Sequence, residues 1–362
     1  MYLDLWGLIS GLVHWLMVDV IGTILRWIHA FSLADWLGSP GVLNIVTILV
    51  VALLILIVGM LVAITLIWME RKALGRFMDR RGTQVGPIGL FQNFADAFKV
   101  LMKEYIVPKS ADPLIYPLAP ILIVGVSMAM FVTIPYSQGF YMSDSDLSLI
   151  LTLALFGVIP FAVLLGGWAS NNKYTLIGGM RAAAQTVAYE VPMLLSVVSV
   201  VVLSGSLSLN DIVAYQMENI WLVVPLIIGF FVFIVSMIAE VERVPFDLPE
   251  AEAELVEGWG TEYGGMRFGL IMMSEYARAF VGSSIIALIF LGGWAGPFAG
   301  IVPEGLWFLA KMFLVFFIFI WARAALPRVR TDQILNICWK RLLPLAAINL
   351  FIAIAFKTLG WF

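Results

Sequence analysis

The sequence predicts an all-α, polytopic membrane protein. Of its 362 residues, 62% are hydrophobic and 12% are charged, whereas a soluble domain carries about twice that share of charge. The apolar residues form long charge-free blocks, for example between Asp35 and Glu70 and between Asp112 and Asp144. Each block exceeds the ~20 residues that a helix needs to cross a bilayer. Helices are the expected form because lipid leaves every backbone polar group to be paired within its own segment.

Eight transmembrane helices are predicted, in a single membrane domain that covers residues 42–362. Their approximate bounds are Val42–Met69, Leu114–Tyr136, Leu147–Trp168, Ala183–Leu203, Ile220–Ala239, Phe268–Leu291, Leu306–Ala322 and Leu342–Phe356. The last is short, but long basic side chains at its two ends can extend to the interfaces.

Residues 1–41 form a predicted N-terminal extension. Its polar residues fall near one helical stripe and large apolar residues such as Trp6 and Trp27 lie opposite them. This pattern favours an amphipathic helix on the membrane surface. A membrane-spanning helix over Tyr2–Ile28 is the alternative, since that stretch is long enough to cross. A cleaved signal peptide is not expected, because the chain has no basic start.

The loop charges predict the orientation in the membrane. The loops after spans one, three, five and seven hold eight, two, two and five Lys and Arg residues, and the three loops between them hold none. By the positive-inside rule, the basic loops face the cytoplasm. Amphipathic surface helices and cytoplasmic loops therefore complete the predicted fold.

Several kinds of chemistry are excluded by composition. His14 and His29 are the only histidines and Cys338 is the only cysteine, so no haem pair, iron–sulfur cluster or other metal site is expected in this chain. No phosphate-binding glycine motif is present. The net charge of −3 gives no reason to expect nucleic acid as a partner. We expect no catalytic residue here, and any redox centre must sit in another chain.

Acids inside the predicted spans are candidate proton-carrying groups. Glu190 lies within span four and has no cation three or four residues away, which favours a proton site. Glu275 lies within span six, three residues before Arg278, so an ion pair within the helix explains it equally well.

The loop over residues 240–267 is the densest charged feature. In its residues 240–263, eight acids stand against one cation, Arg243. Apolar residues such as Phe246 and Trp259 interleave with the acids, which indicates packing rather than a solvated acidic loop. If the part after Pro249 is helical, Glu250, Glu254 and Glu257 share one face. Some of their pKa values would then rise, as a proton relay requires.

The loop over residues 70–113 contains a second candidate element. Leu90–Lys103 places apolar residues, among them Phe94 and Phe98, at helical spacing. An amphipathic helix of this kind suits the headgroup level and could frame an opening from the lipid. A helix that merely covers the core is the alternative.

Together these stretches resemble one family, the H-type membrane subunits of proton-pumping NADH:quinone oxidoreductase (respiratory complex I). The resemblance rests on ERKALGRF at Glu70–Phe77, GPIGLFQNFADAFKVLMKE at Gly86–Glu104, GGWASNNKYTLIGGMRAAAQTVAYEVP at Gly166–Pro192, ERVPFDLPEAEAELVEGWGTEYGGMRFGL at Glu242–Leu270 and WARAALPRVRTDQILNICWKRLLPLA at Trp321–Ala346. It runs from about Val42 to the C-terminus.

The resemblance implies a subunit of a proton-translocating quinone reductase in the inner (cytoplasmic) membrane or an equivalent energy-coupling membrane. Its substrate would be quinone or a similar lipophilic carrier, with no covalently bound cofactor. Flavin and iron–sulfur clusters would lie in partner subunits. The partners would be the iron–sulfur and quinone-site subunits of the peripheral arm and other membrane-arm subunits, including antiporter-like ones.

The resemblance also implies two sets of site residues. The membrane side of the quinone chamber would be lined by Glu70, Arg71, Phe94, Phe98, Lys173, Arg181, Arg243, Phe246 and Asp247. The acidic path that couples quinone reduction to proton pumping would comprise Glu190, Glu240, Glu242, Glu250, Glu252, Glu254, Glu257 and Glu275.

Departures from the family pattern leave alternatives open. Arg80–Gly86 is one residue shorter than usual, and Gly260 stands where His or Asn is common. An equivalent subunit of a related complex with another donor or carrier would keep the same core motifs. Such complexes include a deazaflavin:methanophenazine or ferredoxin:plastoquinone reductase and a membrane-bound hydrogenase. A stand-alone proton-coupled transporter is the alternative from another class.

Overall fold

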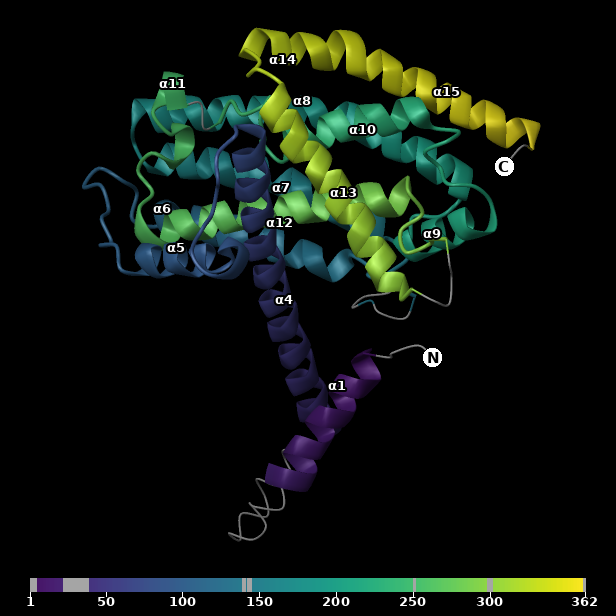
Figure 1. Cartoon of the computed structure of the whole chain (residues 1–362), viewed down its shortest axis with the longest axis horizontal. Coiled ribbons are helices and arrows are strands. Elements are labelled where there is room, and N and C mark those ends of the chain that lie inside the picture. Colours follow the sequence, from purple (N-terminus) through teal and green to yellow (C-terminus); the bar gives the residue numbers. More distant parts are fainter. Residues whose placement is uncertain are drawn as a thin grey trace.

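The computed structural model describes residues 5–21, 39–138, 141, 145–249, 252–297 and 302–360. Within these ranges every regular element is a helix (Figure 1). The prediction of an all-α fold is confirmed for this part of the chain.

Six helical segments are long and apolar enough to cross a membrane, and each coincides with a predicted span. They are α4 (Pro40–Phe77), α6 (Ile115–Ala129) with the short 3₁₀ turn η3 (Met130–Thr133), α7 (Ser148–Ala169), α8 (Lys173–Ser204), α13 (Glu304–Ala325), and the continuous run of α14 (Thr331–Ile337), η5 (Cys338–Leu342) and α15 (Leu343–Leu359).

The other two predicted spans are helices of a different character. α10 (Ile227–Glu240) has 14 residues, fewer than a perpendicular crossing requires. α12 (Gly265–Ile289) has 25 residues but carries Arg267, Glu275 and Arg278. The structure therefore establishes six candidate spans among the described residues, and the total of eight stays a prediction.

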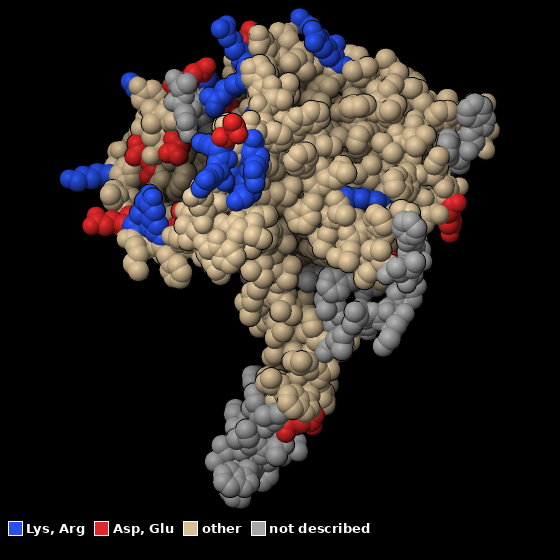
Figure 2. Space-filling model, in the orientation of Figure 1, with Lys and Arg blue, Asp and Glu red and all other residues tan. Residues whose placement is uncertain are grey.

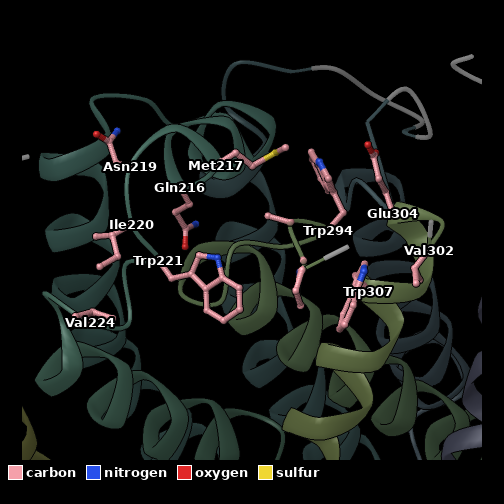
Figure 3. A pocket seen from close by; sticks show the side chains of 13 residues that line it. Gln216, Met217, Asn219, Ile220, Trp221, Val224, Trp294, Val302, Glu304 and Trp307 are labelled. Carbon is pink, nitrogen blue, oxygen red and sulfur yellow. The ribbon is translucent and has the colours of Figure 1, made fainter. Parts of the chain in front are cut away.

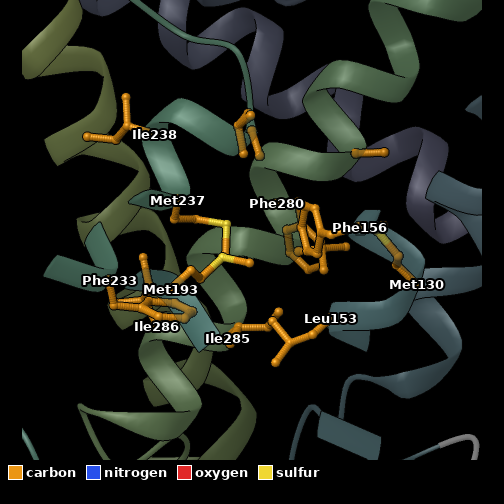
Figure 4. Close-up of a cluster of buried hydrophobic side chains, with 14 of the residues drawn as sticks. Met130, Leu153, Phe156, Met193, Phe233, Met237, Ile238, Phe280, Ile285 and Ile286 are labelled. Carbon is orange, nitrogen blue, oxygen red and sulfur yellow. The ribbon is translucent and has the colours of Figure 1, made fainter. Parts of the chain in front are cut away.

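The core forms around α8 and α12. α8 packs against α7, α10 and α15, while α12 packs against α4, α6 and α13. α12 is buried on all sides from Tyr276 to Ile289, so its apolar half contacts protein rather than lipid. The Phe280 ring of α12 stacks on Phe131, with 5.2 Å between ring centroids. Figure 4 shows Phe280 within a cluster of buried hydrophobic side chains.

The N-terminal part stands apart from this core. α1 (Leu5–His14) and the π-helical turn η1 (Trp15–Ile21) are followed by α4, and α1 packs against α4. Figure 1 shows the N-terminal half of α4 leading away from the other helices, with α1 beside it. The interfacial position of residues 1–41, and the domain boundary after them, stay predictions.

Short helices occupy the connections. The 3₁₀ turn η2 (Pro87–Gly89) and α5 (Phe91–Leu101) follow α4, and α9 (Leu209–Glu218) follows α8. α11 (Glu252–Leu255) and the 3₁₀ turn η4 (Gly258–Gly260) lie in the loop over residues 240–267, which we call the acidic loop. The predicted amphipathic helix over Leu90–Lys103 is therefore present, as α5.

Charged side chains gather at one end of the helices. Figure 2 shows most Lys, Arg, Asp and Glu atoms over the end that carries α5 and α11, whereas the sides are almost free of charge. This one-sided distribution agrees with the loop charges of the sequence. We call it the charged end.

Candidate functional site

The acidic loop is not the helical stack that the sequence suggested. α11 ends at Leu255, because Val256 has a φ of 67° and breaks the helix. Glu254 and Glu257 therefore do not share a helical face, and that prediction was wrong. Glu250 lies outside the described residues, and so does the side chain of Glu252.

The loop is fastened to α8 instead. The Gln185 side-chain amide donates hydrogen bonds to the carbonyls of Ala239 (2.8 Å) and Phe246 (2.7 Å). The backbone of Trp259 lies so close to Gly178 that a Cβ atom there would stand 2.6 Å from the Trp259 nitrogen. A bonded amide and a glycine contact thus hold both halves of the loop on one helix.

The first group of charges surrounds Glu70, at the charged end of α4. This carboxylate is 3% exposed and accepts hydrogen bonds from Arg243 Nη1 (3.1 Å) and from Arg323 at the end of α13. The Arg243 guanidinium also lies over the Tyr276 ring, 4.3 Å from its centroid. One buried acid therefore joins α4, the acidic loop, α12 and α13.

Arg243 is held in its charged form. Burial alone would lower the pKa of its guanidinium, but the nearby Glu70, Tyr276 and Glu275 outweigh this effect and raise the pKa above its usual value. The acidic loop thus contains a permanent, buried positive charge.

The second group lies deeper and links three elements. Arg278 of α12 donates to Glu242 Oε2 at 3.2 Å, and both side chains are buried. Glu240 is 2% exposed and interacts electrostatically with Glu190, Arg278 and Glu242. The Oε2 atom of Glu240 has no hydrogen-bond partner among the described residues.

An ion pair between Glu275 and Arg278 was one explanation of these two residues of α12. Arg278 reaches across to Glu242, and Glu275 interacts electrostatically with Arg243. Glu275 and Arg278 of α12 therefore both connect with the acidic loop. Glu190 is half-buried on α8, with its Oε1 facing Gly157 of α7.

Three further pairs surround these groups nearer the surface. Arg328 donates to Asp247 Oδ2 at 2.7 Å, and Arg181 donates to Glu254 Oε2 at 2.6 Å. Glu254 is 56% exposed, which separates it from the buried acids. Lys173 is also exposed, and its Nζ lies 5.0 Å from the centroid of the Tyr174 ring.

α5 carries the remaining predicted chamber residues. Arg71 pairs with Asp96 of α5, and the Asn93 amide donates to the Ile64 carbonyl of α4 at 2.7 Å. Phe94 and Phe98 point outward and are exposed. Phe246 is instead buried against the Tyr189 ring, at a centroid distance of 5.2 Å. Among the predicted chamber residues, Phe94 and Phe98 on α5 are therefore exposed, whereas Glu70 and Phe246 are buried.

Sequence reasoning missed four residues that complete the site. Arg323 and Arg328 counted only as loop charges, and Tyr276 and Gln185 were not considered. Each bonds or contacts a predicted residue across the fold. A signal existed for Arg323, because it directly follows a long apolar span, where a basic residue needs either the interface or a partner acid.

The fold and the site together define a class, a polytopic helical membrane protein with a buried network of acids and arginines at one end. A family model described as NADH dehydrogenase matches residues 49–354. The chain therefore belongs to the NADH dehydrogenase family, and the predicted family is confirmed.

Curated relatives cover most of the chain. The NADH-quinone oxidoreductase H-subunit of Dehalococcoides mccartyi (strain CBDB1) is 46% identical over 313 residues, which are 86% of this chain and 87% of the relative. The proteins of the same name from Bacillus thuringiensis (strain Al Hakam) and Bacillus anthracis (strain A0248) are each 45% identical over 293 residues, or 80% of this chain and 88% of the relative.

Proposed function

We propose that this chain is the membrane subunit of a proton-translocating NADH:quinone oxidoreductase. It forms the membrane side of the quinone chamber and an acidic path that couples quinone reduction to proton pumping. The observation that carries the proposal is the buried network that runs from Glu70 through Arg243 and the acidic loop to Arg278 and Glu240. Flavin and iron–sulfur clusters belong to partner subunits. The names of the relatives do not favour a related complex with another donor or a stand-alone transporter.

α5 suits the entrance of the chamber. The polar Asn93 is buried and bonded to α4, while Phe94 and Phe98 are exposed, which is the reverse of a helix on a water-soluble protein. Such an outward apolar face is stable when lipid or the isoprenoid tail of a quinone covers it. Glu70, Arg71, Lys173, Arg181, Arg243, Phe246 and Asp247 would line the chamber further in.

A photoreactive quinone analogue tests this entrance. We expect it to label residues between Gln92 and Lys103 in the assembled complex, and excess natural quinone to suppress that labelling about tenfold. The suppression would follow from competition for one site. Phe351 on α15 is the control, because it is 72% exposed and far from α5 in the fold. Labelling at Phe351 should not respond to excess quinone. Equal suppression of labelling at α5 and at Phe351, or no suppression at α5, would refute the proposed entrance.

The deep group suits proton transfer. Three acids, Glu190, Glu240 and Glu242, share the region with one cation, Arg278. Crowded carboxylates that share one cation are suited to accept a proton and pass it on when a nearby charge changes. Quinone reduction beside Glu70 and Arg243 would supply that change. The path continues through Glu250, Glu252, Glu254, Glu257 and Glu275.

Replacing the deep acids tests the path. We expect Glu190→Gln and Glu240→Gln to lower the number of protons translocated per NADH by about half or more, because an amide cannot carry a proton between carboxylates. The measurement is proton uptake by liposomes that contain the purified complex, at equal NADH oxidation rates.

Glu218→Gln is the matched control. Glu218 is an exposed acid of α9, at the end opposite the charged end, so its change should leave the stoichiometry unaltered. Full stoichiometry in both deep variants, at normal complex yield, would refute the path.

The distribution of charged and apolar surface also bears on the location and the partners of the chain. We propose that the charged end faces the cytoplasm, as the distribution of basic loops requires. There it binds the peripheral-arm iron–sulfur and quinone-site subunits. The exposed apolar sides contact lipid and other membrane-arm subunits, including antiporter-like ones. The membrane is the inner (cytoplasmic) membrane or an equivalent energy-coupling one.

A further inference from the structure

An open cavity of about 720 Å³ lies beside the charged end of α4. Its walls are the last turns of α4, with Lys72 and Arg76, and the loop over residues 79–89 that leads to α5. All of these residues are described, and Figure 2 shows basic side chains gathered over this end of α4. No residue of the proposed quinone chamber or acidic path lines the cavity, so it is separate from the site described above.

The loop over residues 79–89 is held in shape through its backbone. The Trp68 indole donates a hydrogen bond to the Ile88 carbonyl at 3.1 Å. The Lys72 ammonium donates to the Thr83 carbonyl, also at 3.1 Å. These bonds fix the loop on α4 without using the arginine side chains of the lining, which stay available for a ligand.

Three arginines of the lining have no acid as a partner. Arg76, Arg80 and Arg81 are exposed, and the ion pairs among the described residues all involve other arginines. Asp79 is the only acid of the lining. Cations that lie together repel one another, and an anion between them removes that repulsion. The cavity therefore suits a ligand with a net negative charge.

Apolar side chains adjoin these cations. Ile88 lines the cavity and is 68% exposed. Val85 and Phe91, three residues before and after it, are exposed as well. Large apolar residues at a membrane surface are stable where lipid covers them. A ligand that fits this place combines an anionic head with an apolar chain.

The cavity lies at the level of lipid headgroups. The apolar stretch of α4 ends at Met69, and Arg76 stands about 10 Å further along the helix. The headgroup layer adds about 5–8 Å to each side of the hydrocarbon core, and a long arginine side chain can bridge the remainder. Anionic headgroups attract such cations, with a gain in binding of about fivefold for each one.

A second cavity of similar volume has the opposite charge. It holds about 710 Å³ between α9 and the start of α13, and Figure 3 shows Trp221, Trp307 and Glu304 around it. Glu304 is the only charged residue among its described lining residues. An anionic head would meet an acid and no lining cation there, so this second cavity serves as an internal control.

We propose that the cavity beside α4 binds an anionic phospholipid of the phosphatidylglycerol type, from the leaflet at the charged end. Its phosphate lies among Arg76, Arg80 and Arg81, and an acyl chain lies against Ile88 and Val85. An acidic segment of a partner protein is the competing occupant, but the exposed apolar residues and the headgroup level favour a lipid. The inference does not depend on the proposed quinone chamber.

The test uses the assembled complex in nanodiscs of phosphatidylcholine that contain a trace of photoreactive phosphatidylglycerol. Labelled peptides are mapped after illumination. We expect label on residues 76–91 and only background label on residues 216–224 of the second cavity. The triple variant Arg76→Gln, Arg80→Gln, Arg81→Gln should lower the label on residues 76–91 more than tenfold, because it removes three cations from the headgroup.

Matched variants separate the cavity from general surface charge. Lys340→Gln combined with Arg341→Gln removes two exposed cations of η5, at the other end of the sequence, and should leave the label on residues 76–91 unchanged. Subunit content and melting temperature of each variant distinguish loss of binding from loss of folding. If the triple variant fails to assemble, each single arginine variant carries the same test, with an expected loss of about fivefold.

Four outcomes would overturn the proposal. The first is equal labelling of residues 76–91 by a photoreactive phosphatidylcholine, which has no net charge. The second is displacement of the label by free glycerol 3-phosphate at the concentration of the lipid, which would indicate a soluble anion. The third is unchanged labelling in the arginine variants. The fourth is absence of label on residues 76–91 in the assembled complex, which would show that a partner protein fills the cavity.

Discussion

Arg278→Leu is expected to reduce the amount of assembled complex in the membrane by more than tenfold. Arg278 and Glu242 are 1% and 6% exposed in their side chains, and they bond to each other at 3.2 Å. Removing the arginine leaves a buried carboxylate without its cation, at a cost of about 3–5 kcal/mol. That cost is a large part of the stability of a typical folded domain. Complex content on native gels and the temperature of half-inactivation measure the effect.

The double variant Arg278→Leu with Glu242→Gln separates charge from packing. Replacing both partners of a buried pair costs much less than removing one, so the double variant should recover most of the complex. Arg181→Leu is the control, because Arg181 pairs with an exposed Glu254 and such pairs contribute only about 0–1 kcal/mol. If the single and double variants assemble equally poorly, the pair is not what stabilises this region.

The membrane-spanning helices could be predicted because a helix that crosses lipid needs about 20 consecutive, mostly apolar residues. Span three was expected over Leu147–Trp168, and α7 covers Ser148–Ala169. Where charged residues continue a helix beyond the bilayer, hydrophobicity gives no boundary. α8 therefore begins at Lys173, ten residues before the predicted Ala183, and α4 continues to Phe77. Residues such as Lys, Arg and Ala are good helix formers in water and need no lipid.

The site was predicted as a set of residues but not as a set of pairs. Spacing along a helix left open whether Arg278 pairs with Glu275, and in the fold Arg278 bonds to Glu242, 36 residues away. Glu70 bonds to Arg323, which lies 253 residues further along the chain. A single sequence carries no information on such distant pairs, because any basic residue near a span end satisfies the same local rule.

The acidic loop shows a second limit. A helical face was expected after Pro249 from the regular spacing of glutamates, and the chain turns at Val256 instead. Packing explains the difference, because Trp259 and the bonded Phe246 are both held against α8. Tertiary contacts of this kind override a local helical pattern.

Glu70→Gln is expected to lower quinone reductase activity more than tenfold while the complex still assembles. The amide keeps the size of the side chain but no longer neutralises Arg243 and Arg323, which both bond to this one carboxylate. The variant removes the strongest influence that raises the pKa of Arg243. A guanidinium nevertheless keeps its charge in proteins, so two guanidinium groups would then repel each other beside the proposed chamber. Their movement would displace the acidic loop, since Arg243 belongs to it.

The measurement compares two electron acceptors in the same preparation. A hydrophilic acceptor takes electrons in the peripheral arm, so NADH oxidation with this acceptor should stay normal. NADH oxidation with quinone should fall, and the KM for quinone should rise. Asp79→Asn is the control. It removes the charge of an exposed acid on the same side, at a φ of 52°, which asparagine tolerates well. Normal quinone reduction in Glu70→Gln would show that this carboxylate does not organise the chamber, because no other described carboxylate bonds to both arginines.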